Sequence, residues 1–317
     1  MLENFIYSIN VTIPIFLVMV LGYFLRRRGM LNENFVNVAN KFNFEVTLPF
    51  MVFRDIAAVD IRSVFDLKYV LFCAIASSVC FWVVWGLAKL FIKDKSLIGA
   101  FVQASFRSSA AVMGLAFISN LYGPSAMGPL MIIGAVPLYN VYSVLVLTFE
   151  AEDDGTGRDT GKLKEACVNI LKNPIIISIV LGLIVSLCKL DFPVLVDNTI
   201  DNVAKMATPL ALITLGAGFE GREALAKMKP TLWAAFIKLI GQAAIFIPIA
   251  IALGFTGEKL IAIMVMLAAP ATPSCYIMAK NMKNDGVLTA SIIVTTTLLA
   301  AFTLTGWIFI LRSMGYI

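Results

Sequence analysis

The sequence has 317 residues, of which 60% are hydrophobic and 14% are charged, with a formal net charge of +5. A soluble domain usually contains about 25% charged residues, so this composition excludes a water-soluble globular protein and indicates several membrane spans. The basic residues are divided among loops instead of forming one patch, and we expect a lipid bilayer and no nucleic acid as the surroundings.

We expect an all-α membrane protein with ten transmembrane helices, because a hydrocarbon core about 30 Å thick needs about 20 apolar residues per helix. In chain order the apolar runs cover residues 7–25, 38–53, 67–92, 97–121, 126–150, 173–190, 194–219, 231–254, 257–282 and 286–311. No basic region precedes the first run and no small-residue cleavage site follows it, so we expect it to be retained instead of removed as a signal peptide.

The basic residues predict the orientation in the membrane. Fifteen of them fall on one side of this ten-helix topology, at positions 26, 27, 28, 89, 93, 95, 158, 162, 164, 172, 222, 227, 229, 280 and 283, and six fall on the other, at positions 54, 62, 68, 189, 259 and 312. Cytoplasmic loops carry the excess of Lys and Arg. We therefore expect a multi-pass protein of the cell membrane with both termini outside the cytoplasm.

The chain contains an internal repeat. A shift of 160 residues aligns "IPIFLVMVLGYFL" from Ile13 with "NPIIISIVLGLIV" from Asn173, and it superposes Gly22 on Gly182 without a gap. Chance matches between apolar segments are the alternative. Each copy holds an odd number of spans, so the second copy must run in the opposite direction. The sequence predicts two inverted five-helix repeats, at residues 1–150 and 173–317, joined by a charged cytoplasmic linker at 151–172.

The fourth and ninth spans occupy matching places in the two copies, and both are interrupted. The ninth, "LAAPATPSCYIMAKNM", holds Pro270 and Pro273 beside Thr272 and Ser274. Each proline deletes a backbone donor, and in hydrocarbon such breaks persist where they are buried in protein or line a wet cavity. A kink absorbed by helix packing is the alternative. We expect helices 4 and 9 to be broken and to cross, with helix ends that favour an anion.

The fourth span has no proline but carries Arg107, Ser108, Ser109 and Gly114 near its middle. An ionisable residue at this depth predicts a functional site, and a guanidinium can hold a carboxylate through two parallel hydrogen bonds. Snorkelling to the membrane surface is the competing interpretation of Arg107. The serines could instead bond to their own helix, and Gly114 could simply allow close helix contact.

The second and seventh spans carry charges whose signs are exchanged by the repeat. Lys41 and Glu45 face Asp201 and Lys205, and each pair is spaced by four residues, so each could form its own ion bridge on one helix face. We expect a coupling or supporting role, with anchoring at the membrane surface as the alternative. The chain has no histidine, so proton coupling would use Glu45 or Asp201.

No catalytic motif is present, neither a zinc-protease HExxH, a nucleophile elbow nor a Walker loop. The five cysteines are scattered singly, at positions 73, 80, 167, 188 and 275, without metal or redox spacing. We therefore expect neither an enzyme nor a bound metal or cofactor.

The segments "PIFLVMVLGYFLRRRGML", "VTLPFMVF", "FRSSAAVMGLAF", "PLYNVYSVLVLTFE" and "AAPATPSCYIMAKNM" resemble, in their order and spacing, the auxin efflux carrier family, the bacterial and plant PIN-like transporters. The resemblance implies a scaffold part, a transport part with the crossing helices, and an elevator-like motion. It implies small organic anions such as malonate, malate or auxin-like acids as substrates, bound beside the crossing, with Tyr139 and Asn140 close by. A homodimer is compatible with it.

The sequence departs from this family in its fourth span, where the usual NxxxMGxP has Ser109 in place of Asn and Ala116 in place of Pro. We expect a secondary carrier or facilitator of a small carboxylate, driven by a proton or sodium gradient or by the gradient of the substrate itself. The alternatives are a sodium-coupled symporter of the bile-acid carrier type and a non-transporting membrane receptor.

Overall fold

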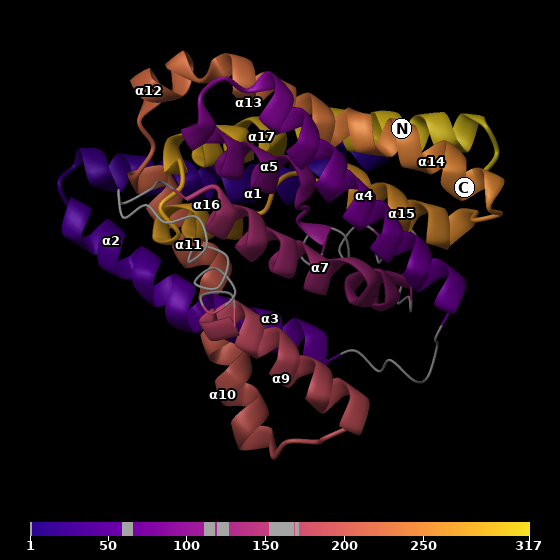
Figure 1. The fold of residues 1–317 in the computed structure, drawn as a ribbon, viewed down its shortest axis with the longest axis horizontal. Helices are drawn as coiled ribbons and strands as arrows, with labels where there is room; N and C mark the ends of the chain where they lie inside the picture. Colours follow the sequence, from indigo (N-terminus) through magenta and orange to yellow (C-terminus); the bar gives the residue numbers. More distant parts are fainter. Residues whose placement is uncertain (1, 59–65, 111–117, 119–126, 152–167, 169–170) are drawn as a thin grey trace.

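The computed structural model of the chain describes residues 2–58, 66–110, 118, 127–151, 168 and 171–317 (Figure 1). The described residues form helices and turns and no strand, which confirms the all-α class. Gly114 and most of the expected linker lie outside these ranges.

In the first half of the chain the described residues form the following helices. They are α1 (Leu2–Arg27), α2 (Glu33–Phe42), the π-helix η1 (Asn43–Thr47), α3 (Leu48–Ala57), α4 (Leu67–Phe91), the 3-10 helix η2 (Lys95–Leu97), α5 (Ile98–Phe106) and α7 (Met127–Phe149). Asn32 and Asp66 are the N-cap residues of α2 and α4, and their side chains accept backbone N–H groups of the first turn.

The second half contains α9 (Pro174–Cys188), α10 (Val194–Lys205), α11 (Ala207–Ala217), α12 (Gly221–Ala226), α13 (Met228–Phe236), the π-helix η4 (Ile237–Gly241), α14 (Gln242–Ala252), α15 (Gly257–Ala268), α16 (Ser274–Asn281) and α17 (Gly286–Ser313). α13, η4 and α14 form one continuous helix, and the expected ninth span is divided into α15 and α16.

Four helices of the described residues are long and apolar enough to cross a membrane. They are Leu67–Phe91, Leu130–Phe149, Met228–Ala252 and Gly286–Ser313, which correspond to the expected third, fifth, eighth and tenth spans. The shorter apolar helix Pro174–Cys188 corresponds to the sixth. These helices support a membrane-embedded protein.

The helix bounds follow the 160-residue shift. Applied to residues 33–57, which hold α2 to α3, the shift gives 193–217, and α10 to α11 cover 194–217. Applied to α4 it gives 227–251, and α13 to α14 cover 228–252. The paired elements thus begin and end within one residue of the places that the repeat predicts.

Two close helix contacts are also related by this shift. A Cβ atom on Gly22 of α1 would lie 2.2 Å from the carbonyl oxygen of Ile213 in α11. A Cβ atom on Gly182 of α9 would lie 3.1 Å from the carbonyl oxygen of Phe53 in α3. The shift carries Gly22 onto Gly182 and Phe53 onto Ile213. Through a glycine, α1 of the first half therefore packs against α11 of the second half, and α9 of the second half packs against α3 of the first.

Contacts at the helix ends show how the long helices run. Lys68 Nζ, at the start of α4, donates to the Leu253 carbonyl at the end of α14, at 2.6 Å. The Tyr69 hydroxyl donates to the Met127 carbonyl at 3.4 Å, so α4 and α7 start side by side. Because of the contact between Lys68 and Leu253, the start of α4 lies at the same end of the molecule as the end of α14.

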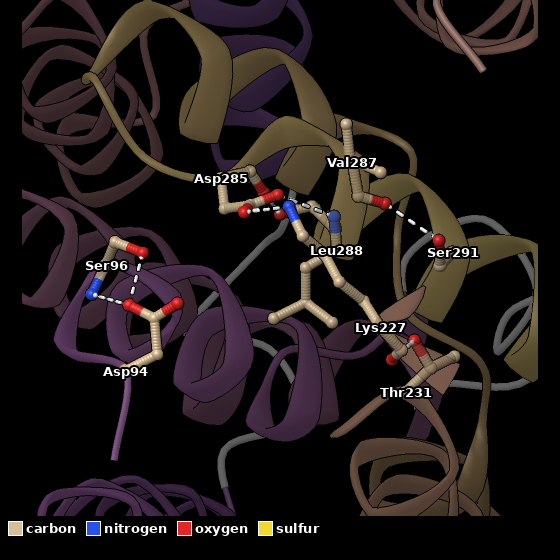
Figure 2. Close-up of polar contacts among 9 residues, drawn as sticks. Asp94, Ser96, Lys227, Thr231, Asp285, Val287, Leu288 and Ser291 are labelled. Atoms are coloured by element: carbon tan, nitrogen blue, oxygen red, sulfur yellow. Dashed lines mark hydrogen bonds and ion pairs between the residues drawn. The ribbon is translucent and has the colours of Figure 1, made fainter. Parts of the chain in front are cut away.

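The starts of α13 and α17 are joined by a separate ion pair between Lys227 and Asp285 (Figure 2). Asp285 also caps α17 by accepting the Leu288 N–H at 2.8 Å. Like α4 and α7, these two helices start side by side.

The core surrounds the divided ninth span. Every residue of α15 from Leu260 to Ala268 is at most 1% exposed. α7, α14 and α17 lie against α15, and a helix that is apolar on all sides can be buried among such neighbours. The break between α15 and α16 is therefore in the interior of the protein.

Candidate substrate site at the helix crossing

The interruptions of the fourth and ninth spans meet. α5 ends at Phe106, and its C-cap residue Arg107 has an extended backbone. The Ser109 N–H donates to the Pro270 carbonyl at 2.9 Å, and the Ser108 hydroxyl donates to the Ala269 carbonyl at 3.4 Å. Two chain segments more than 160 residues apart thus contact each other where each has stopped being helical.

The two prolines leave carbonyl groups at the end of α15 without helical partners, because proline has no N–H to donate four residues back. Pro270 frees the carbonyl of Met266, which accepts the Tyr139 hydroxyl at 3.1 Å. Pro273 frees the carbonyl of Ala269, which is the acceptor for Ser108.

Two further groups left by the break also find partners. The Pro270 carbonyl would bind the amide of Ser274 in an unbroken helix, and it accepts Ser109 instead. The Ala271 amide donates to the Thr296 hydroxyl of α17, at 3.2 Å. Groups from α7, from α17 and from the segment that follows α5 thus satisfy groups that an uninterrupted helix would pair internally.

Side chains of the eighth span donate hydrogen bonds to carbonyl groups at the ends of α5 and α15. Lys238 Nζ donates to the Leu267 carbonyl at the end of α15, at 2.9 Å. Gln242 Nε2 donates to the Ser105 carbonyl at the end of α5, at 2.7 Å. Lys238 lies in the π-helix η4 and Gln242 follows four residues later, so both project from one face. π-turns inside helices often occur at functional sites.

Arg107 is buried beside the crossing, with 5% of its surface exposed. Its Nη2 donates to Asn140 Oδ1 at 2.8 Å, and its Nη1 lies 2.8 Å from Met278 Sδ and 3.4 Å from Ser143 Oγ. The guanidinium therefore points into the protein, between α7 and α16, and the competing interpretation of snorkelling does not describe it.

Tyr139 and Asn140 lie together with Arg107, as the resemblance implies. Asn140 Nδ2 donates back to the Val136 carbonyl at 2.9 Å, which leaves its oxygen directed to Arg107. The Thr272 and Ser274 hydroxyls are 3.2 Å apart at the start of α16. Thr272 is half-buried, whereas Ser274 is buried.

The ends that meet here differ in part from the expected ones. Among the described residues they are the C-terminal ends of α5 and α15 and the N-terminal end of α16. A helix C-terminus carries about half a negative charge and an N-terminus about half a positive charge. Two basic side chains, Arg107 and Lys238, are buried beside them, and no carboxylate of the described residues pairs with either one.

The charged pairs of the second and seventh spans lie apart from these contacts. Lys41 and Glu45 are 3.9 Å apart and mostly exposed. Asp201 pairs with Lys205, and Arg54 Nη1 also contacts it at 3.1 Å. Both ion bridges that the four-residue spacing suggests are therefore present. Within the described ranges, no hydrogen bond or ion pair links either bridge to the crossing.

The roles of Lys238, Gln242 and Thr296 were not predicted from the sequence. Lys238 did carry a signal, because it is the single charge inside an apolar span, and Gln242 stands at the i+4 position from it. Thr296 lies within the run "TTT", and nothing in the sequence around it indicates a functional role. Its role depends on α17 passing beside the break.

Comparisons with known proteins support a transporter. Residues 7–308 match the family described as "Membrane transport protein". The protein named "Uncharacterized transporter YfdV" from Escherichia coli (strain K12) is 23% identical over 208 residues, 64% of this chain and 66% of the relative. Proteins of the same name from Escherichia coli O157:H7 and Shigella flexneri match equally.

The matched part spans just under two thirds of these relatives' length, at 66%. The family match, by contrast, extends over nearly the whole chain. It identifies a membrane transporter and not an enzyme. The chain belongs to the membrane transport protein family, that of the auxin efflux carriers.

Proposed function

We propose that this transporter is a secondary carrier or facilitator of a small organic anion that bears a carboxylate group. The observation that carries the proposal is the burial of Arg107 and Lys238 at the helix crossing without a carboxylate partner among the described residues. A buried charge is costly unless it is paired, so an anionic solute would complete the site.

The balance of charge supports an anionic solute. The C-terminal ends of α5 and α15 contribute about −1 together, and the two side chains contribute +2. The N-terminal end of α16 adds about +0.5. With both side chains protonated the sum is about +1.5; one carboxylate would lower it to about +0.5 and a second would lower it to about −0.5. We assign Arg107, Ser108, Ser109, Tyr139, Asn140, Pro270, Thr272, Pro273 and Ser274 to the substrate site, together with Gly114, which lies outside the described residues.

The helix contacts support two inverted repeats, residues 1–150 and 173–317. The start of α4 adjoins the end of α14, which belongs to the repeat partner of α4. Repeat partners that run in opposite directions have this arrangement, whereas copies threaded in the same direction would bring start beside start. The paired glycine contacts of α1 with α11 and of α9 with α3 support the same arrangement.

The position of Lys238 bears on the coupling ion. Its ammonium group donates to the carbonyl at the end of α15, where a bound sodium ion would otherwise neutralise carbonyl oxygens. This favours a proton gradient or the substrate's own gradient over the sodium-coupled alternative. Glu45 and Asp201 remain the proposed coupling or supporting carboxylates, with Lys41 and Lys205 as their partners.

The experiment is uptake of radiolabelled malonate, malate and indole-3-acetate into proteoliposomes that contain the purified protein, with and without sodium. We expect uptake of at least one acid without a sodium requirement. Arg107→Gln should reduce uptake at least about tenfold, because a charged hydrogen-bonding group is lost at a buried site. Arg28→Gln, which alters an exposed arginine, is the control.

Three outcomes would contradict the proposal. Unchanged uptake by a folded Arg107→Gln protein would remove Arg107 from the site. Strict sodium dependence would favour the symporter, and no flux of any acid would favour a receptor.

A further inference from the structure

A cavity of about 670 Å³ opens at the end of the molecule where α1 and α11 end and α2 begins. α12 and α16 complete its wall, and these elements gather on the left of Figure 1. Four cations and three carboxylates line it, namely Arg26, Arg27, Arg222 and Lys280 with Glu33, Glu220 and Glu223. All four cations belong to the larger group of basic residues, so the sequence predicts that this end faces the cytoplasm.

The four cations of this cavity are accessible to a ligand. Arg26 is half-buried, and Arg27, Arg222 and Lys280 are exposed. None of them forms an ion pair with a carboxylate of the described residues, although three carboxylates line the same wall. A cleft that gathers charges of one sign concentrates ions of the opposite sign. The unpaired cations therefore favour an anionic group inside the cavity.

Local contacts hold three of these side chains at the wall and leave donors available. Arg26 Nη1 donates to the Leu31 carbonyl at 3.3 Å, and Arg27 Nε donates to the Tyr23 hydroxyl at 3.1 Å. A guanidinium has five N–H groups, so most donors of both arginines have no partner among the described residues. The stem of Lys280 lies against the glycine that begins α17, where an added Cβ atom would be 3.0 Å from the lysine Cγ.

The cavity lies where α1, the expected first span, leaves the apolar region. The apolar stretch of α1 ends at Leu25, and three arginines follow it. Leu17, Leu21 and Phe24 are exposed and share one face of the helix. The Arg28 guanidinium stacks over the Phe24 ring, 4.4 Å from its centroid. Aromatic residues mark the membrane–water interface, and basic clusters directly cytoplasmic of a transmembrane helix bind anionic lipids.

We propose that this cavity binds the headgroup of an anionic phospholipid, with the phosphodiester on the cations and the acyl chains along the exposed face of α1. Four cations and three carboxylates give the wall a formal charge of +1. A phosphodiester carries one negative charge and neutralises it. A phosphate monoester carries about −1.5 to −2 at neutral pH, which would leave an excess of negative charge. The planar guanidinium can also bind two phosphate oxygens at once.

The site would connect lipid binding to the helix crossing. Lys280 lies near the end of α16, and Ser274 at the start of the same helix borders the crossing. Arg26 and Arg27 belong to the last turn of α1. A phosphate bound to cations of both helices would hold α16 against α1. Anionic lipid would therefore stabilise the present position of α16.

The test is lipid binding by the purified, delipidated protein in a neutral detergent. The melting temperature is measured as phosphatidylglycerol is added to the micelles, and native mass spectrometry counts the lipids that remain bound. Phosphatidylethanolamine, which has a phosphodiester but no net charge, and inorganic phosphate, which has no acyl chains, are tested in parallel. We expect phosphatidylglycerol to be retained and to raise the melting temperature, with phosphatidylethanolamine at least about tenfold weaker.

Variants of the wall locate the binding. Arg27→Gln with Lys280→Gln should raise the fraction of phosphatidylglycerol needed for half-maximal stabilisation at least about tenfold, because two hydrogen bonds from charged groups are lost. Lys93→Gln with Lys95→Gln is the matched control, since both lysines are exposed on the same predicted side and outside the cavity lining. Glu223→Gln removes a carboxylate of the wall and should lower that fraction.

Three results would overturn the inference. Equal binding of the two lipids would show that the charge of the headgroup is not recognised. Equal weakening by the two double variants would show attraction by the overall surface charge instead of the cavity. Stabilisation by inorganic phosphate that matches phosphatidylglycerol would show a site for soluble anions. All these side chains are exposed, so the variants should fold, and their melting temperatures without lipid verify this.

Discussion

The backbone amide of Ser109 donates to the carbonyl of Pro270 at 2.9 Å, so the interruptions of two separate helices satisfy one another. Neither group would be available if its own helix were continuous. Ser109 would otherwise bind the Ser105 carbonyl, which accepts Gln242 instead. The crossing is therefore a set of exchanged hydrogen bonds, and replacing one proline should disturb it.

Pro270→Ala restores an N–H that can bind the Met266 carbonyl within α15, in competition with Tyr139. Alanine also has a better helix propensity than proline by about 3 kcal/mol in a helix interior. We expect the melting temperature to stay level or rise while anion uptake falls. Pro248→Ala in α14 is the control, since this proline is exposed and outside the crossing. Unchanged uptake by a folded Pro270→Ala protein would show that the break is not needed for transport.

Tyr139→Phe should destabilise the protein by about 1–3 kcal/mol, because the Met266 carbonyl is left buried without a donor. Tyr142→Phe removes a hydroxyl that donates to Ser78 at 2.9 Å, but Ser78 keeps its own bond to the Ala74 carbonyl. Tyr142→Phe should therefore lower the free energy of unfolding by less than Tyr139→Phe does. Thermal unfolding in one detergent compares the two variants, and equal losses would argue against the role assigned to Tyr139.

Lys238→Met removes the buried ammonium group at the end of α15. The Leu267 carbonyl loses its donor, but the desolvation of a charge in the interior is relieved, so the two effects on stability oppose each other. We expect a small change in melting temperature and at least a tenfold loss of apparent affinity for the anion, about 1.4 kcal/mol. Lys93→Met alters an exposed lysine between α4 and η2 and is the control. Full affinity in Lys238→Met would contradict the proposed charge balance.

Stability should depend on acid pH through Asp66, which lies outside the membrane-spanning helices at the start of α4. The Lys259 ammonium, 2.5 Å away, and the Tyr69 backbone N–H hold the pKa of Asp66 below its ordinary value. A lowered pKa in the folded state stabilises the protein above the unfolded pKa of about 4, and this contribution is lost as the pH falls through the folded value.

The variant Asp66→Asn lacks this titration but keeps an N-cap side chain. Melting temperatures of the two proteins should therefore differ most above about pH 5 and converge as the pH falls toward 3. A constant difference over this range would show that the ion pair with Lys259 does not contribute through the charge of Asp66.

The membrane class, the 160-residue offset between matching segments and the place of the break can be predicted from the sequence, because each depends on properties of the chain itself. Hydrophobic run length predicts spans, and the bounds of α10 to α11 and α13 to α14 follow the 160-residue shift. Pro270 and Pro273 cannot donate in any fold. The position at which α15 stops was therefore predictable, as was the ion bridge of each charged pair spaced by four residues.

The partners of the freed groups depend on how the helices pack in three dimensions. The Met266 carbonyl binds Tyr139, 127 residues away, and the Ala269 carbonyl binds Ser108, 161 residues away. Lys238 is an isolated lysine in the sequence, and it caps α15 only because the eighth span passes the break. α5 stops without a proline, since the Ser109 amide donates to the Pro270 carbonyl in the interrupted ninth span. A missing donor is a local property, whereas its replacement depends on which helices are neighbours.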